Sequence, residues 1–162
     1  MTISSDNLLM FPGVDPAFLV TQIHEEQIAL CDALEKIADS LPDNLDRQSC
    51  LQVARSLPGL MARAHQIEEE VLFPTLRSRR PNVPGLNKTL DRLHYEHLED
   101  DCYAEELFDA LMSHGQGNGR PDSEAFGYML RGFFEGLRRH LAYEDELLLP
   151  LCQNEKDDAN AV

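Results

Sequence analysis

Four stretches of the chain repeat apolar residues at the three- and four-residue spacing of an amphipathic helix, whereas the Val, Ile and Thr runs that mark strands are scarce. A helix of this kind buries its apolar stripe only by packing against other helices. Loops rich in Pro, Gly and Asn separate the stretches. The sequence therefore predicts an all-α fold, an up-down-up-down antiparallel four-helix bundle. The expected helices cover about residues 16–41, 44–79, 87–113 and 121–152.

Prolines inside the second stretch predict irregularities. Pro58-Gly59 predicts a kink or a split, and Pro74 predicts a bend near the end of the helix. We expect three parts in the chain, namely an N-terminal arm, the bundle and a flexible tail, over residues 1–15, 16–153 and 154–162.

The chain is acidic, with 29 Asp and Glu against 14 Lys and Arg, and a net charge of −15. This balance argues against nucleic acid and against anionic membrane surfaces as partners. No stretch approaches the roughly 18 apolar residues of a membrane span. The four cysteines form no C-x-x-C pair, which disfavours a thiolate zinc site, and the first residues do not resemble a secretory signal. We therefore expect a cytoplasmic protein.

Each apolar stripe contains one histidine: His24, His65, His97 and His140. A single histidine in such a stripe is usually an ordinary core residue, but one on each of four helices is a stronger pattern. Ligands in helical bundles come from facing helices at a shared depth. The four imidazoles are therefore candidate metal ligands.

Two glutamates extend this set. Glu69 follows His65 by four residues, and Glu144 follows His140 by four, so each pair shares one helix face. A glutamate buried on a core stripe needs a cation to balance its charge. Imidazole and carboxylate together suit iron, manganese or zinc, and a carboxylate has two oxygens with which to bridge two ions.

The two pairs belong to two similar hairpins. HQIEEEVLFP begins at His65 and HLAYEDELLLP begins at His140, and each is preceded by a helix with its own histidine, 41 and 43 residues upstream. Counting back from Pro74 makes Glu68 an alternative to Glu69, whereas the four-residue spacing favours Glu69.

These two motifs, with QIHEEQ and HYEHLE on the preceding helices, resemble the hemerythrin-like HHE cation-binding family over residues 16–152. The resemblance implies a left-twisted bundle around two iron ions joined by an oxo or hydroxo bridge, for which zinc or manganese are possible substitutes. It implies that Glu69 and Glu144 are bridging carboxylates. It also places His24 and His65 on one iron, with His97 and His140 on the other.

His94 is a further candidate ligand. Oxygen-carrying members of the family have two ligand histidines four residues apart on the third helix, whereas His94 and His97 are three apart and still share a face. With His94 as a ligand, the family picture leaves one open position on the two irons, and without it two. Both alternatives remain open.

The resemblance implies a non-haem di-iron protein that binds or senses O2 or NO, or handles iron, rather than an enzyme, and no catalytic residue is assigned. One alternative is a di-iron oxidase or a peroxide- or NO-scavenging stress-repair enzyme. Another is a helical interaction module without metal or with zinc. Ferritin-like di-iron proteins use E-x-x-H motifs, which this chain lacks.

Overall fold

The computed structural model describes residues 13–118 and 122–153. Residues 1–12 of the predicted arm and the whole predicted tail, 154–162, lie outside the described residues. So does residue 121, where the fourth helix was expected to begin.

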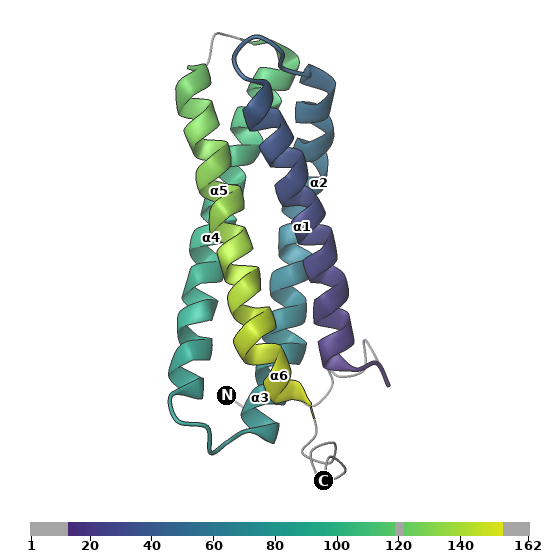
Figure 1. Cartoon of the computed structure of the whole chain (residues 1–162), viewed down its shortest axis with the longest axis vertical. Coiled ribbons are helices and arrows are strands. Elements are labelled where there is room, and N and C mark those ends of the chain that lie inside the picture. Colours follow the sequence, from purple (N-terminus) through teal and green to yellow (C-terminus); the bar gives the residue numbers. More distant parts are fainter. Residues whose placement is uncertain (1–12, 119–121, 154–162) are drawn as a thin grey trace.

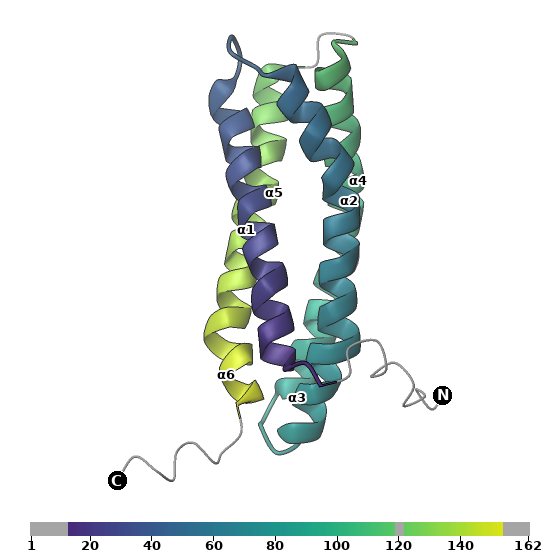
Figure 2. The same ribbon diagram turned by 90° about the vertical axis from the view of Figure 1, so that its right-hand side faces the viewer.

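Four long helical segments run alternately up and down in an antiparallel bundle (Figures 1 and 2). The helix α2 packs against α4, and α1 packs against both α5 and α2. The described residues therefore confirm the predicted all-α four-helix bundle. In chain order the elements are α1 (Pro16–Ser40), α2 (Arg47–Ile67), η2 (Glu68–Leu72), α3 (Phe73–Arg79), α4 (Leu86–Gln116), α5 (Ser123–Tyr143), η3 (Glu144–Leu148) and α6 (Leu149–Cys152).

Aspartates start three of these segments. The side chains of Asp15, Asp46 and Asp122 accept hydrogen bonds from the first free N–H groups of α1, α2 and α5. At the other end of α4, Gly117 adopts the left-handed conformation at φ 70°, which ends the helix. The sequence predicted a loop from about residue 113, but α4 continues to Gln116 and carries His114 within it.

The second segment is not split at Pro58, although its sequence predicted a kink or a split there. Pro58 is exposed, and the helix α2 runs through it. Residues on either side, such as Ala54, Leu57 and Met61, are buried in one apolar cluster. Packing of this stripe therefore outweighs the hydrogen bond that the proline removes.

The predicted irregularity near Pro74 takes the form of a π-turn. In η2 the N–H of Phe73 donates to the carbonyl of Glu68, five residues back, and in η3 Leu149 donates to Glu144 in the same way. Each π-turn directly precedes a short helix with a proline in its first turn, Pro74 or Pro150. A proline lacks an N–H and crowds the carbonyl four residues back, so a wider turn accommodates it.

Two apolar clusters fill the bundle. The larger one lies around Leu34, Leu57 and Leu107, and the smaller one around Leu76 and Leu90. The last residue of each π-turn, Leu72 or Leu148, belongs to the smaller cluster, whereas the four stripe histidines belong to neither cluster's buried core. In the described residues no helix is long and apolar enough to cross a membrane.

Candidate metal centre

The bundle brings the stripe histidines and two glutamates into its interior. His24 comes from α1, His65 from α2, His97 from α4 and His140 from α5. The first residue of each π-turn, Glu68 or Glu144, supplies a carboxylate that is 0% exposed. The His24, His65 and His97 side chains are also buried, and that of His140 is 8% exposed.

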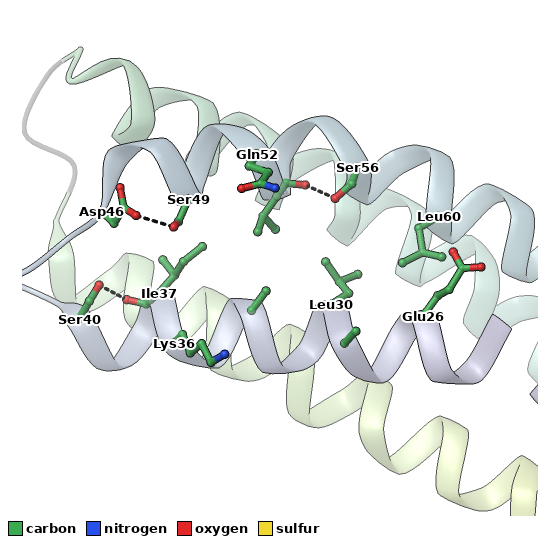
Figure 3. A pocket seen from close by; sticks show the side chains of 13 residues that line it. Glu26, Leu30, Lys36, Ile37, Ser40, Asp46, Ser49, Gln52, Ser56 and Leu60 are labelled. Atoms are coloured by element: carbon green, nitrogen blue, oxygen red, sulfur yellow. Dashed lines mark hydrogen bonds between the residues drawn. The ribbon is translucent and has the colours of Figure 1, made fainter. Parts of the chain in front are cut away.

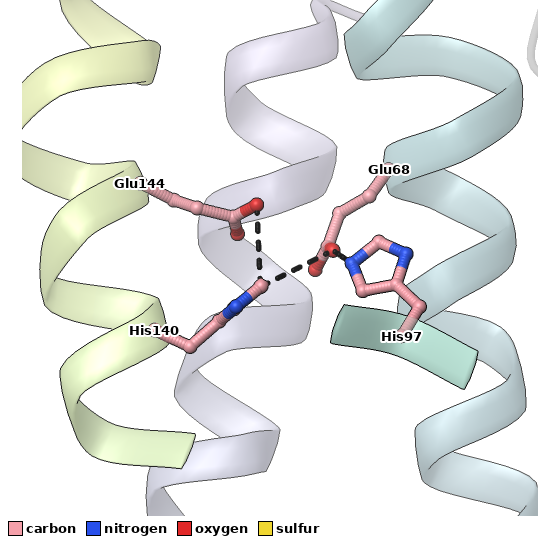
Figure 4. A group of neighbouring side chains, drawn as sticks. All are labelled: Glu68, His97, His140 and Glu144. Carbon is pink, nitrogen blue, oxygen red and sulfur yellow. Dashed lines mark ion pairs between the residues drawn. The ribbon is translucent and has the colours of Figure 1, made fainter. Parts of the chain in front are cut away.

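Four of these residues form a tight cluster. Glu68, His97, His140 and Glu144 each offer one ligand atom, and these atoms lie within 4.8 Å of one another (Figure 4). The Nε2 atom of His24 lies 3.0 Å from Glu144 Oε2 and 3.9 Å from Glu68 Oε1. Three imidazoles therefore direct Nε2 toward two buried carboxylates.

The buried carboxylates lack the hydrogen bonds that would balance them within the described protein. Both oxygens of Glu68 and one of Glu144 have no hydrogen-bond partner. His97 Nε2 lies 2.7 Å from Glu68 Oε2, but the two atoms are not aligned as a hydrogen bond. Leaving such groups unpaired is costly, and a cation removes the cost. Imidazole nitrogens with carboxylate oxygens form a donor set that fits iron, manganese or zinc.

Protons take the place of that cation in the protein without metal. Burial by itself lowers the pKa of His140, but Glu144 and Glu68 outweigh it and raise this pKa to about 11. Burial raises the pKa of Glu68, but the imidazoles of His140 and His97 outweigh it and lower this pKa to about 2. The cluster is thus arranged to hold positive charge against its two carboxylates.

The outer nitrogens of two of these rings also have carboxylate partners. His24 Nδ1 lies 2.7 Å from Asp145 Oδ1, and His97 Nδ1 lies 2.7 Å from Glu69 Oε1, both with hydrogen-bond geometry. Burial raises the pKa of Glu69, but its hydrogen bonds with His97 and His94 outweigh this effect and lower the pKa. The Glu69 side chain is 32% exposed, so it lies outside the buried cluster.

His65 and His94 occupy different surroundings. The His65 ring stacks on His97 with centroids 4.2 Å apart, and its Nδ1 lies 2.9 Å from Asp101 Oδ1. Burial and the neighbouring His97 lower the pKa of His65. The His94 side chain is 51% exposed, and its Nδ1 is 2.9 Å from Glu69. The structure therefore brings His65 to the edge of the cluster and leaves His94 at the surface.

Sequence reasoning named Glu68 only as an alternative and did not name Asp145. The spacing to the prolines is a signal for Glu68, since Glu68 and Glu144 each lie six residues before a proline. Asp145 has the corresponding signal, because it follows Glu144 as Glu69 follows Glu68. The partners of these second acids lie on other helices, and neither spacing nor periodicity identifies them.

A cavity of about 260 Å³ reaches the cluster from the surface between α4 and α5. Its walls include His140, Glu96, Arg92, Gly136 and Tyr143. This volume exceeds the space that a water molecule or a diatomic molecule needs.

A larger groove, of about 540 Å³, lies between α1 and α2 (Figure 3). None of the four cluster residues lines it, and we assign it no role in the metal centre. The side chains labelled in Figure 3 are Glu26, Leu30, Lys36, Ile37, Ser40, Asp46, Ser49, Gln52, Ser56 and Leu60.

One of three comparisons with known proteins found a match. The model of the hemerythrin HHE cation binding domain family matches residues 15–152, which is most of the chain. A comparison with curated proteins and one with solved structures found no match. By the extent of the family match, the chain belongs to the hemerythrin HHE cation-binding family.

Proposed function

We propose that the buried cluster holds two iron ions and that the protein binds or senses a small diatomic ligand there, O2 or NO, or handles the iron itself. One observation carries the proposal: two carboxylates that water does not reach, from Glu68 and Glu144, share a pocket with three imidazole Nε2 atoms. Uncompensated burial of two carboxylates is too costly to retain without positive charge.

The proposed ligands are the inward-facing atoms. Glu68 and Glu144 would supply the carboxylates of the site, so Glu68 takes the part for which the four-residue spacing favoured Glu69. The proposed histidine ligands are His24, His97 and His140. His65 is included as a fourth, because its ring stacks on that of His97 at the edge of the cluster. His94 is not in the proposed set, because its ring is half exposed and contacts Glu69 instead.

The donor set fits iron as the resident metal, as it also fits manganese and zinc. Iron held by imidazole and carboxylate, with a coordination position left open, supplies a place at which O2 or NO binds. The buried carboxylates are shielded from solvent, and the cavity that His140 lines offers an approach to them. This approach suits a molecule of a few atoms.

Metal analysis and optical spectroscopy test the proposal together. Protein produced in iron-replete medium should contain two iron ions per chain and show a near-ultraviolet to visible band that appears with O2 and reverses on its removal. Turnover of peroxide or NO, without reversible binding of O2 or NO, would show that the protein is an enzyme rather than a binding protein. Protein that takes up no metal from iron-replete medium would contradict the proposal.

A further inference from the structure

Each π-turn begins with three acidic residues. The triplets are Glu68-Glu69-Glu70 in η2 and Glu144-Asp145-Glu146 in η3. The first acid of each triplet is 0% exposed. The second is open to solvent, with side-chain exposures of 32% for Glu69 and 53% for Asp145. In both triplets, therefore, the first acid is buried in the interior and the second lies nearer the surface.

The first two acids of a triplet contact opposite edges of one imidazole. Around His97, Glu68 lies 2.7 Å from Nε2 and Glu69 lies 2.7 Å from Nδ1. Figure 4 shows Glu68 on the inner side of the His97 ring.

The same arrangement recurs around His24. Glu144 lies 3.0 Å from its Nε2, and Asp145 lies 2.7 Å from its Nδ1. Each ring belongs to the helix against which the acid-bearing segment packs, with α4 beside α2 and α1 beside α5. The two halves of the bundle thus repeat one unit, in which two consecutive acids hold a histidine of a neighbouring helix.

The second acid decides which nitrogen carries the proton. A neutral imidazole has one N–H and one lone pair, and an ionised carboxylate only accepts hydrogen bonds. A carboxylate beside Nδ1 therefore keeps the proton on Nδ1 and leaves the lone pair on Nε2. Histidines that bind metals commonly donate their other N–H to a carboxylate, which fixes the ring and strengthens its bond to the metal.

We propose that Glu69 and Asp145 are positioning residues, which accept the Nδ1–H of His97 and His24 so that Nε2 of each ring faces the metal. This inference rests on the proposed metal site and adds residues that do not touch the metal. It is limited to these two rings, since the contacts of the other two are poorer. His140 Nδ1 lies 3.5 Å from Glu96, and His65 Nδ1 is not aligned with Asp101 for a hydrogen bond.

The third acid of each triplet supplies a matched control. Glu70 contacts Gln66 of its own segment, and Glu146 is exposed. Glu70→Ala and Glu146→Ala therefore remove the same charge from the same turns as Glu69→Ala and Asp145→Ala. Because Glu69 also contacts His94, His94→Ala controls for the loss of that contact.

Zinc affinity, measured by competition with a chelator, is the first readout. Glu69→Ala and Asp145→Ala should each weaken zinc binding by about 10- to 100-fold, the usual effect of removing such a partner. The Glu70, Glu146 and His94 variants should bind like the unchanged protein. Glu69→Gln and Asp145→Asn should recover much of the affinity, because an amide oxygen still accepts the Nδ1–H.

Nitrogen-15 NMR of the zinc-loaded protein is the second readout. If Glu69 and Asp145 had a purely structural role, their substitution would leave the imidazole Nδ1–H signals unchanged. The Nδ1–H signals of His24 and His97 should be sharp in the unchanged protein, because their hydrogen bonds slow exchange with water. The His24 signal should broaden in Asp145→Ala, and the His97 signal in Glu69→Ala.

Affinities within twofold of the unchanged protein for both alanine variants, or an equal loss in the control variants, would overturn the inference. Failure of the unchanged protein to bind zinc and iron would instead overturn the proposed function, and this inference with it. Metal binding by the unchanged protein therefore distinguishes failure of this inference from failure of the proposed function.

Discussion

Glu68 and Glu144 are the residues on which the chemistry of the interior depends. Both carboxylates are fully buried, and three of their four oxygens have no hydrogen-bond partner in the described protein. Their neighbours are imidazoles, which accept either a proton or a metal ion. The interior therefore holds groups that can bind protons or, as we propose, metal ions.

Substitution of single residues should separate ligands from neighbours. Glu68→Ala and Glu144→Ala should reduce the bound iron to less than one ion per chain, because each removes one of the two buried carboxylates of the proposed site. His140→Ala should do the same, since its Nε2 lies 3.4 Å from Glu144 and 3.7 Å from Glu68. His94→Ala should retain the full iron content. Full iron content in both glutamate variants would refute the ligand assignment.

The metal-free protein should be most stable between about pH 4.5 and 6.5. The pKa of His140 is raised from 6.5 to about 11. Its contribution to the free energy of unfolding is therefore complete below pH 6.5 and is lost as the pH rises toward 11. The pKa of Glu68 is lowered from 4.5 to about 2, so its contribution is present above pH 4.5 and is lost as the pH falls toward 2.

Urea unfolding of chelator-treated protein from pH 4 to pH 10 measures this dependence. The urea concentration at the unfolding midpoint should decrease as the pH rises above 6.5. His140→Gln should make this decrease shallower, because the titrating group is gone. A decline of equal steepness in His140→Gln would show that other groups control the alkaline limb.

At the scale of elements, the glutamate that enters the interior is the first residue of a π-turn in each half of the bundle. A continuous α-helix places residues four apart on one face, which is why the spacing favoured Glu69. The described structure instead buries Glu68, which begins the π-turn that ends beside Pro74. The prolines can be read from the sequence. The π-turn that precedes each of them also depends on how the helix packs, which the sequence does not show.

The helices themselves could be predicted because their apolar stripes are long and regular. The ends differ by a few residues, as at α4, where Gly115 packs closely against Leu51 and the helix continues to Gln116. The contacts of Asp145 and Glu69 could not be predicted, because each joins two helices that are distant in sequence. Only the register between packed helices determines such pairs.

The helix α2 offers a test of how packing overrides local preference. Pro58→Ala should raise the free energy of unfolding by about 1–3 kcal/mol, because it restores an N–H inside an exposed part of the helix. Gly59→Ala, whose added Cβ meets no atom within 4 Å, should add about 0.5–1 kcal/mol. Chemical denaturation measures both, and a loss of stability in Pro58→Ala would show that the helix is bent to fit the proline.

At the scale of the whole molecule, the proposed metal centre would join all four helical segments. The proposed ligands lie on α1, α2 with η2, α4, and α5 with η3, so that metal bound there would oppose separation of any one of them. The apolar clusters make a folded protein without metal feasible, and the net charge of −15 favours cation uptake.

Metal loading should therefore raise the melting temperature. A metal present at a thousand times its dissociation constant adds about 4 kcal/mol, which corresponds to a rise of about 10 °C for a chain of this size. Calorimetry of iron- or zinc-loaded protein against chelator-treated protein measures the difference. An unchanged melting temperature in protein shown to contain metal would place that metal outside the bundle interior.

Anomalous diffraction at the iron edge from crystals of the iron-loaded protein would locate the bound iron ions. We expect two iron peaks between Glu68 and Glu144, with Nε2 of His24, His97 and His140 among the ligands. We also expect Glu69 and His94 outside the coordination sphere. A peak bound by Glu69 or His94, or no iron between the two buried carboxylates, would contradict the proposed site.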